Sequence, residues 1–139
     1  MEPAMEMNEL TQKVIGAALE VHRALGPGYQ ESIYEEALAL ELTRTGIEFE
    51  RQRAFSVKYK EHIVGEGKVD LLIEGRLVVE LKAVEKMQPV HKAQVISYLK
   101  ATSCQLGLLI NFNESLLRSG VQRIVYTDPL RLSVSAANY

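Results

Sequence analysis

Two acidic residues and a lysine occupy positions at which a strand-like sequence would bury them. Asp70 lies in the run 68–73, and Glu80 and Lys82 lie in the run 76–84, both otherwise rich in Val, Leu and Ile. Alternation along the second run places Glu80 and Lys82 on one face of a strand. Burying charge is costly unless the charge is paired or bound to a metal. These residues therefore predict a site for a cation.

The connection between the two runs decides whether the carboxylates meet. A two-residue loop at 74–75 would set Asp70 opposite Val79 and leave Glu80 on the wrong face. A three-residue loop or a bulge would instead set Asp70 opposite Glu80. Two carboxylates about 4 Å apart repel by roughly 4 kcal/mol at an effective dielectric constant of 20. One of them must then take up a proton, or a cation must lie between them.

Oxygen ligands of this kind suit a hard cation, and we expect Mg²⁺, with Mn²⁺ as a substitute. Lys82 would reach the same spot, where it could hold an attacking water and stabilise charge on a phosphate. The competing interpretation is a Glu80–Lys82 ion pair on an exposed edge strand, with Asp70 as an acid close to a turn. The apolar flanks of both runs favour the functional interpretation.

The elements that must position these residues follow from hydrophobic periodicity. Helices are predicted over 8–25, 30–44 and 90–102, and strands over 49–60, 68–73, 76–84, 106–112 and 123–127. Asn8 is expected to cap the first helix, and the glycine-rich turn 26–28 to end it. The order α-α-β-β-β-α-β-β predicts an α/β sandwich around a mixed sheet.

Length and composition agree with one globular domain over 1–139, with residues 1–8 expected to be flexible. The net charge of −2 argues against a protein that coats nucleic acid by bulk attraction, but it does not exclude an enzyme with a local basic face. No apolar run is long enough to span a bilayer, and the first residues lack the features of a signal peptide. With one cysteine, Cys104, expected to be buried, we anticipate a cytoplasmic protein without a membrane partner.

Asp70 followed by Glu80-Leu81-Lys82 resembles the signature of the PD-(D/E)XK nuclease superfamily, with Val69 where the signature has Pro. The segment 28–34 reads Gly-x-x-Glu-x-x-Tyr and, with 20–28, 79–83 and 108–112, resembles the GxxExxY protein family of predicted nucleases. The similarity extends over about 10–125. It implies a restriction-endonuclease-like core, with a mixed central sheet flanked by helices and one extra N-terminal helix.

The resemblance also implies roles for individual residues. Asp70, Glu80 and the Leu81 carbonyl would hold the metal, and Lys82 would position the water. Glu31 would support the metal as the glutamate of the first core helix. The plainer interpretation of Glu31 is a surface acid that the dipole of a helix N-terminus favours.

The helix over 90–102 carries a second pattern. Gln94 and Tyr98 are one turn apart and share a face, which resembles the Q-x-x-x-Y motif of RecB-type nucleases. Gln94 would then join the catalytic group through a bond to Lys82 or to a phosphate, and Tyr98 would stack on a base or sugar. The alternative is an amphipathic helix with two ordinary polar residues.

Other charged residues near this helix could form a local phosphate track, namely Lys86, His91, Lys92 and Lys100. A solvated charged face is the default for such residues. His22 is expected to be structural, and Tyr34 is as compatible with packing as with function.

The sequence thus predicts a metal-dependent nuclease that hydrolyses phosphodiester bonds, with DNA favoured over RNA as the partner. One alternative is an inactive nucleic-acid-binding or assembly module with the same fold. Another is a homodimeric endonuclease for branched DNA, similar to Holliday-junction resolvases. Fold alone cannot choose among these functions.

Overall fold

A computed structural model describes residues 5–128 of the chain. The helices are α1 (Met7–Leu25), α2 (Glu31–Arg44), α3 (Pro89–Thr102) and the short 3₁₀ helix η1 (Leu117–Gly120); the strands are β1 (Phe49–Tyr59), β2 (His62–Ile73), β3 (Leu77–Lys82), β4 (Leu106–Asn111) and β5 (Val121–Val125). The predicted order of helices and strands is confirmed. Within the described part of the chain, no helix combines the length and apolar character needed to cross a bilayer.

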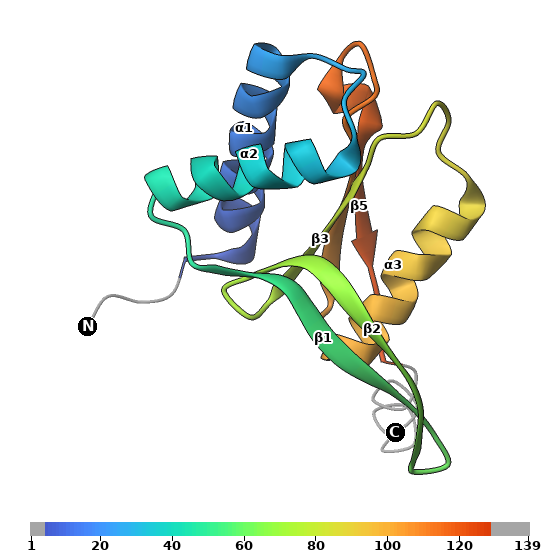
Figure 1. The fold of residues 1–139 in the computed structure, drawn as a ribbon. Helices are drawn as coiled ribbons and strands as arrows, with labels where there is room; N and C mark the ends of the chain where they lie inside the picture. Colours follow the sequence, from blue (N-terminus) through green and yellow to red (C-terminus); the bar gives the residue numbers. More distant parts are fainter. Residues whose placement is uncertain (1–4, 129–139) are drawn as a thin grey trace, which may run out of the picture.

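The five strands form one mixed sheet in the order β1-β2-β3-β4-β5. Only β3 and β4 run parallel, and the other three neighbouring pairs are antiparallel. Helices α1 and α2 lie over one face and α3 over the other (Figure 1). The strand that carries Glu80 and Lys82 is therefore central, not an edge strand, and the exposed ion-pair interpretation is wrong on this point.

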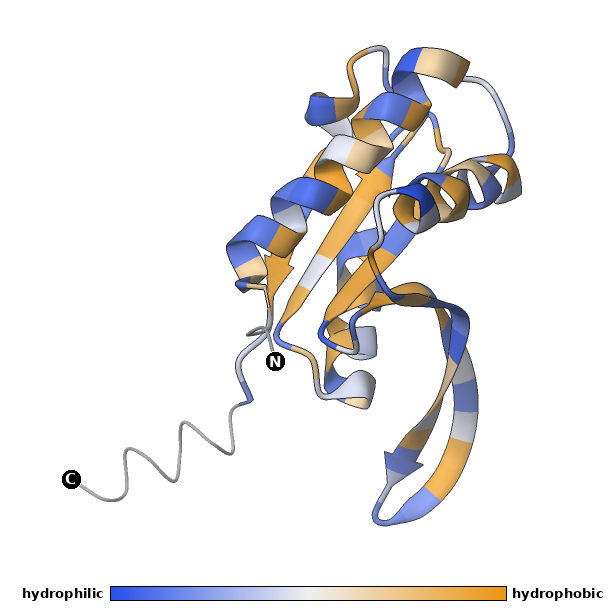
Figure 2. Cartoon of the chain, turned by 90° about the vertical axis from the view of Figure 1, so that its left-hand side faces the viewer, coloured by the Kyte–Doolittle hydropathy of each residue, from blue (hydrophilic) through white to orange (hydrophobic). Residues whose placement is uncertain are grey.

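Each face of the sheet has its own apolar core. Leu71 and Val79 face α1 and α2, whereas Val78 and Leu109 face α3. Figure 2 shows apolar residues concentrated along the strands between the helices. Opposite faces of one strand are thus both buried, because helices cover both sides.

Most boundaries differ from the predicted ones by one or two residues, and the differences at α1 and β2 change the description of the fold. Residues 1–4 of the segment expected to be flexible lie outside the described residues, and α1 already begins at Met7. Asn8 does not cap this helix; Glu6 holds the N-cap position without a side-chain bond, and the Asn8 side chain accepts a hydrogen bond from Arg123 (3.2 Å). Strand β2 begins at His62 instead of residue 68, so it pairs with β1 along a long projecting hairpin (Figure 1).

A three-residue loop, 74–76, joins β2 to β3. Ile73 pairs with Leu77 and Leu71 pairs with Val79, so the same register places Asp70 opposite Glu80. Positive φ angles at Glu74 (52°) and Gly75 (70°) turn the chain here. The loop length that sequence parity required is thus confirmed.

Tyr34 is a packing residue that fixes the entry to α2. Its ring is fully buried and stacks on Phe112, with centroids 4.5 Å apart. Its hydroxyl donates to the Gly26 carbonyl (2.6 Å) and accepts from the Tyr29 N–H (3.1 Å). These bonds tie the turn after α1 to the first turns of α2, where Glu31 begins the helix.

We predict that Tyr34→Phe lowers the free energy of unfolding by about 1–2 kcal/mol, because it leaves a backbone donor and an acceptor without their shared partner. Urea unfolding monitored by circular dichroism measures the change. Tyr29→Phe is the matched control, since Tyr29 is 47% exposed and bonds Tyr34 through its backbone. Equal stability of wild type and Tyr34→Phe would contradict this role.

Candidate active site

Strands β2 and β3 stop pairing through their backbones just before the two acidic residues. The last backbone pair is Leu71 with Val79. Beyond it the carboxylates bond crosswise to the facing strand: the Asp70 N–H donates to Glu80 Oε1 (2.7 Å), and the Leu81 N–H donates to Asp70 Oδ2 (2.9 Å). Each side chain therefore satisfies a backbone donor that the separating strands leave behind.

This arrangement holds two acids at one point inside the protein. Glu80 is only 4% exposed, and Asp70 is half-buried. Burial, followed by the charge of Asp70, raises the pKa of Glu80 to about 8. Burial also raises the pKa of Asp70, although the Leu81 N–H and Gln52 oppose the rise. At neutral pH and without a cation, Glu80 therefore holds a proton.

Helix α3 brings two further predicted residues to this point. Lys82 Nζ donates to Gln94 Oε1 at 3.4 Å, across the space between β3 and α3. Tyr98, one turn along α3, has a raised pKa because of burial and then because of the Glu80 and Asp70 charges. Lys82 forms no ion pair with any residue in the described range 5–128. Its ammonium group is thus held near both acids by an amide instead of being neutralised by one of them.

Glu31 approaches from the other face of the sheet, at the first position of α2. Desolvation, and then the charge of Asp70, raises the pKa of Glu31, and Lys82 lowers it. The charge of Glu31 in turn adds to the rise at Glu80. Glu31, Asp70, Glu80 and Lys82 are therefore electrostatically coupled, although Glu31 itself lies exposed at the surface.

Gln52 is a site residue that sequence reasoning missed. Its amide donates to Glu35 Oε1 (2.6 Å) and to Asp70 Oδ1 (3.3 Å), and Glu35 is held in turn by Arg51 (2.9 Å). Gln52 has a φ of 50°, which is unfavourable for a residue with a side chain. The strand is locally distorted where Gln52 meets Asp70, because the backbone pairs resume only at Arg53 with Val69. Neither the distortion of the strand nor the contacts of Gln52 with Glu35 and Asp70 leave a signal in the sequence pattern.

Asn111 is a second missed residue and supports the segment after β3. It is fully buried, its Oδ1 accepts from the Val84 N–H (3.1 Å), and its Nδ2 donates to the Val84 carbonyl (2.9 Å). Asn111 pairs with Lys82 across the parallel strands β3 and β4. The position of the chain beyond Lys82 is thus fixed by a buried amide. A polar residue at the end of an apolar strand was the available signal.

The predicted phosphate track consists of residues in very different surroundings. Lys86 and Lys92 are exposed. His91 Nδ1 accepts the Gln88 N–H (2.9 Å) as part of a capping box at the start of α3, which gives it a structural role. Lys100 Nζ lies 5.7 Å from the centre of the Tyr126 ring. That these residues form a track that contacts phosphates stays a prediction.

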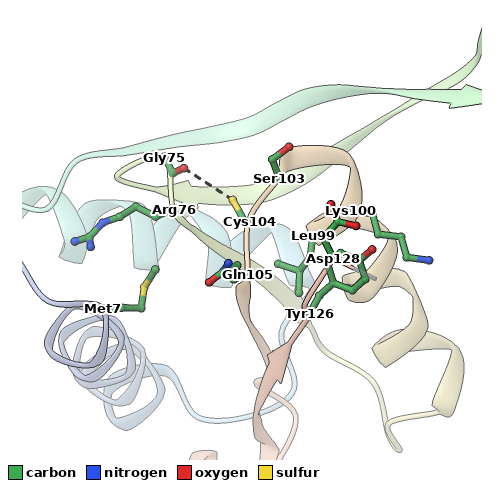
Figure 3. A pocket seen from close by; sticks show the side chains of 10 residues that line it. All are labelled: Met7, Gly75, Arg76, Leu99, Lys100, Ser103, Cys104, Gln105, Tyr126 and Asp128. Carbon is green, nitrogen blue, oxygen red and sulfur yellow. Dashed lines mark hydrogen bonds between the residues drawn. The ribbon is translucent and has the colours of Figure 1, made fainter. Parts of the chain in front are cut away.

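His22 and Cys104 have the structural character that was expected. His22 Nε2 lies 2.7 Å from the Glu114 carbonyl and joins α1 to the loop after β4. Cys104 is buried, beside a cavity of about 510 Å³ (Figure 3). The loops that precede β3 and β4 line this cavity, together with Tyr126 and Asp128. It lies at the opposite end of β3 from Lys82. Lys100, one of the residues of the predicted phosphate track, lines it.

The donor set at the acids fits a hard divalent cation. Among the described residues, no three His, Cys, Asp or Glu side chains are arranged to hold a metal together. The donor set instead consists of two carboxylates, those of Asp70 and Glu80. Each of them uses one oxygen to accept a backbone N–H. A cation that displaced the proton of Glu80 would relieve the repulsion between them, and the Leu81 carbonyl and Glu31 stay predicted additional ligands.

Comparisons with known proteins agree with this geometry. The model of the PD-(D/E)XK nuclease superfamily matches residues 8–124. The crystal structure of SSO0001 is similar in fold, with a TM-score of 0.50 and 16% identity over 96% of this chain and 84% of that chain. The comparison with curated proteins gave no match. The narrower resemblance to GxxExxY proteins stays a prediction. The family match covers most of the chain, including both strands of the acidic pair, and the chain therefore belongs to the PD-(D/E)XK nuclease superfamily.

Proposed function

We propose that this protein hydrolyses phosphodiester bonds in DNA with the help of Mg²⁺. Membership of the superfamily supports a metal-dependent nuclease in general. The observation that carries the specific proposal is the buried pair Asp70–Glu80 beside a lysine that neither acid neutralises. Such a pair is costly in a purely structural role, since the neighbouring backbone donors could have been satisfied by ordinary strand pairing.

Each residue has a physical task in this proposal. Asp70 and Glu80 hold the cation, with Glu31 as a further acid from α2. Mg²⁺, when bound, would polarise the phosphate and lower the pKa of a water. The Lys82 ammonium orients the attacking water and balances charge that develops on the phosphate. Gln94 holds Lys82 in place through the 3.4 Å bond, and Gln52 holds Asp70.

The DNA would approach along α3. Tyr98 lies on the same helix face as Gln94, one turn further on, and presents an aromatic ring for a base or sugar. Lys86 and Lys92 lie in and just after the loop that joins β3 to α3, and would contact flanking phosphates. Because the whole chain has a net charge of −2, attraction depends on these local cations.

We predict that Lys82→Ala lowers the rate of DNA cleavage by on the order of a hundredfold, because it removes one group that stabilises the transition state. Metal and DNA binding should change little, since the carboxylates remain and only one cationic contact is lost. Lys82→Arg should also cleave poorly, because its planar donors differ in geometry from an ammonium group. Initial rates, DNA affinity and melting temperature are measured together.

Lys13→Ala serves as the control, since Lys13 is exposed on α1 and pairs only weakly with Glu9 (4.0 Å). Unchanged cleavage by folded Lys82→Ala protein would rule out the proposed role. A large loss of stability, without selective loss of cleavage, would favour a structural partner of the acids and hence the non-catalytic alternative.

We predict that Mn²⁺ or Mg²⁺ raises the melting temperature of the wild-type protein but not that of Asp70→Asn. A cation that binds only the folded state contributes about 2.7 kcal/mol at 100 times its dissociation constant. Asp70→Asn removes a ligand while keeping an oxygen that accepts the Leu81 N–H. An equal rise in both proteins would show that the metal binds elsewhere.

Stability without metal should fall as the pH rises from about 4.5 to about 8. Glu80 ionises near 4.5 in the unfolded chain and near 8 in the folded protein. Between these values the folded state binds more protons, and the free energy of unfolding falls by about 1.4 kcal/mol per pH unit. The stability is fully present below the lower pKa and lost above the higher one.

Melts over this pH range test the effect. Glu80→Gln should show a clearly smaller slope, with the remainder due to Asp70 and Glu31, whose pKa values are also raised. Glu9→Gln, an exposed acid in the first turn of α1, is the control. A slope that is the same in Glu80→Gln and wild type would contradict the assignment of the proton to Glu80.

A further inference from the structure

A groove separates the β1–β2 hairpin from α3, outside the acidic pair. Its volume is about 730 Å³, within the range of about 300–1,000 Å³ that is usual for pockets that bind organic ligands. The hairpin contributes Phe55, Val57, Lys58 and Gly67, and α3 contributes Ser97 and Tyr98. Figure 1 shows the hairpin extending away from the sheet alongside the lower part of α3.

An aromatic pair lines this groove. The rings of Phe55 and Tyr98 are 5.2 Å apart at a tilt of 50°, and both residues are partly exposed. Gly67 makes room for this pair, since a Cβ atom there would lie 2.5 Å from Phe55 Cζ. Two partly exposed aromatic residues, positioned side by side, offer apolar surface on which planar groups can stack.

The groove lies one turn of α3 away from the candidate active site. Gln94, near the middle of α3, contacts Lys82, and Tyr98, one turn further on, lines the groove. Burial, and then the charges of Glu80 and Asp70, raise the pKa of Tyr98, so its hydroxyl lies within electrostatic reach of the acids. A polymer whose phosphate is at the acids could therefore continue into the groove.

The charges along the groove are mixed, and this bears on the kind of ligand. Lys58 and Lys100 line it together with Glu66, and the Lys100 ammonium lies towards the Tyr126 ring. Such a lining attracts phosphates weakly, whereas the aromatic wall attracts base faces. Paired bases in a duplex are already stacked and hide these faces, but a single strand exposes them.

We propose that this groove binds a single-stranded segment of DNA next to the bond that is cleaved. Phe55 and Tyr98 stack on its bases, and Lys58 contacts its backbone. This inference rests on the proposed nuclease function and specifies its substrate as DNA with a single-stranded flank. It also gives the projecting β1–β2 hairpin a task, namely to form the outer wall of the binding site.

The test compares two fluorescent DNA probes, a blunt duplex annealed from two complementary strands and the same duplex with an oligothymidine extension, in EDTA so that cleavage does not occur. We expect the extension to strengthen binding by about tenfold, which corresponds to roughly 1.4 kcal/mol and to one stacked base. Ser97→Glu places a negative charge in the groove at an exposed position without altering the core. It should abolish the gain from the extension and leave the affinity for the blunt duplex unchanged.

Ser119→Glu introduces the same charge on the exposed surface of η1 and is the matched control. Phe55→Ala should also abolish the gain, and its melting temperature shows whether the hairpin remains folded. Equal binding of both probes, or an equal gain in Ser97→Glu and wild type, would overturn the inference. Self-association in sedimentation experiments that Ser97→Glu alone removes would also overturn it, because the groove would then be a contact between copies.

Cleavage of both probes in Mg²⁺ distinguishes failure of the groove inference from failure of the proposed nuclease function. If wild-type protein cleaves DNA but gains nothing from the extension, the groove inference fails and the nuclease function stands. If the extension strengthens binding but no DNA is cleaved, the proposed function fails and the groove binds single strands without catalysis.

Discussion

Crosswise hydrogen bonds between Asp70 and the β3 backbone, and between Glu80 and the β2 backbone, set the geometry of the whole site. Strands β2 and β3 separate at this point, and the two carboxylates accept the backbone N–H groups that strand pairing would otherwise satisfy. The acids are therefore fixed by the sheet itself rather than by a loop. Burial, and then the charge of the adjacent Asp70, raises the pKa of Glu80, so the folded chain must carry either a proton or a cation there.

Helices on both faces of the sheet supply the residues that surround Asp70, Glu80 and Lys82. Helix α2 brings Glu31, and its residue Glu35 holds Gln52, which contacts Asp70. Helix α3 brings Gln94 to Lys82. Close packing of α3 on β4 depends on Gly107, where a Cβ atom would lie 2.8 Å from Val95 Cγ1. Both helices must therefore be docked before the charges of the site are arranged.

Periodicity and parity in the sequence predicted the order of the elements and the facing of Asp70 and Glu80. Parity was decisive because side chains alternate strictly in a strand, so only a three-residue loop or a bulge could bring the acids together. The start of β2 was predicted six residues too late, because the residues from His62 to Gly67 are mostly exposed and include two glycines, which are poor strand residues. The role of Gln52 was not predictable either, since it depends on an unusual backbone angle and on a contact with a separate helix.

In the proposed site, Glu80 holds a proton that a divalent cation displaces. Calorimetric titration with Mn²⁺ at neutral pH, in buffers with different ionisation enthalpies, measures the number of protons released on binding. We expect the wild-type protein to release close to one proton and Glu80→Gln to release almost none, at whatever affinity that variant retains. Metal binding by the wild type without proton release, or the same release from Glu80→Gln, would contradict it.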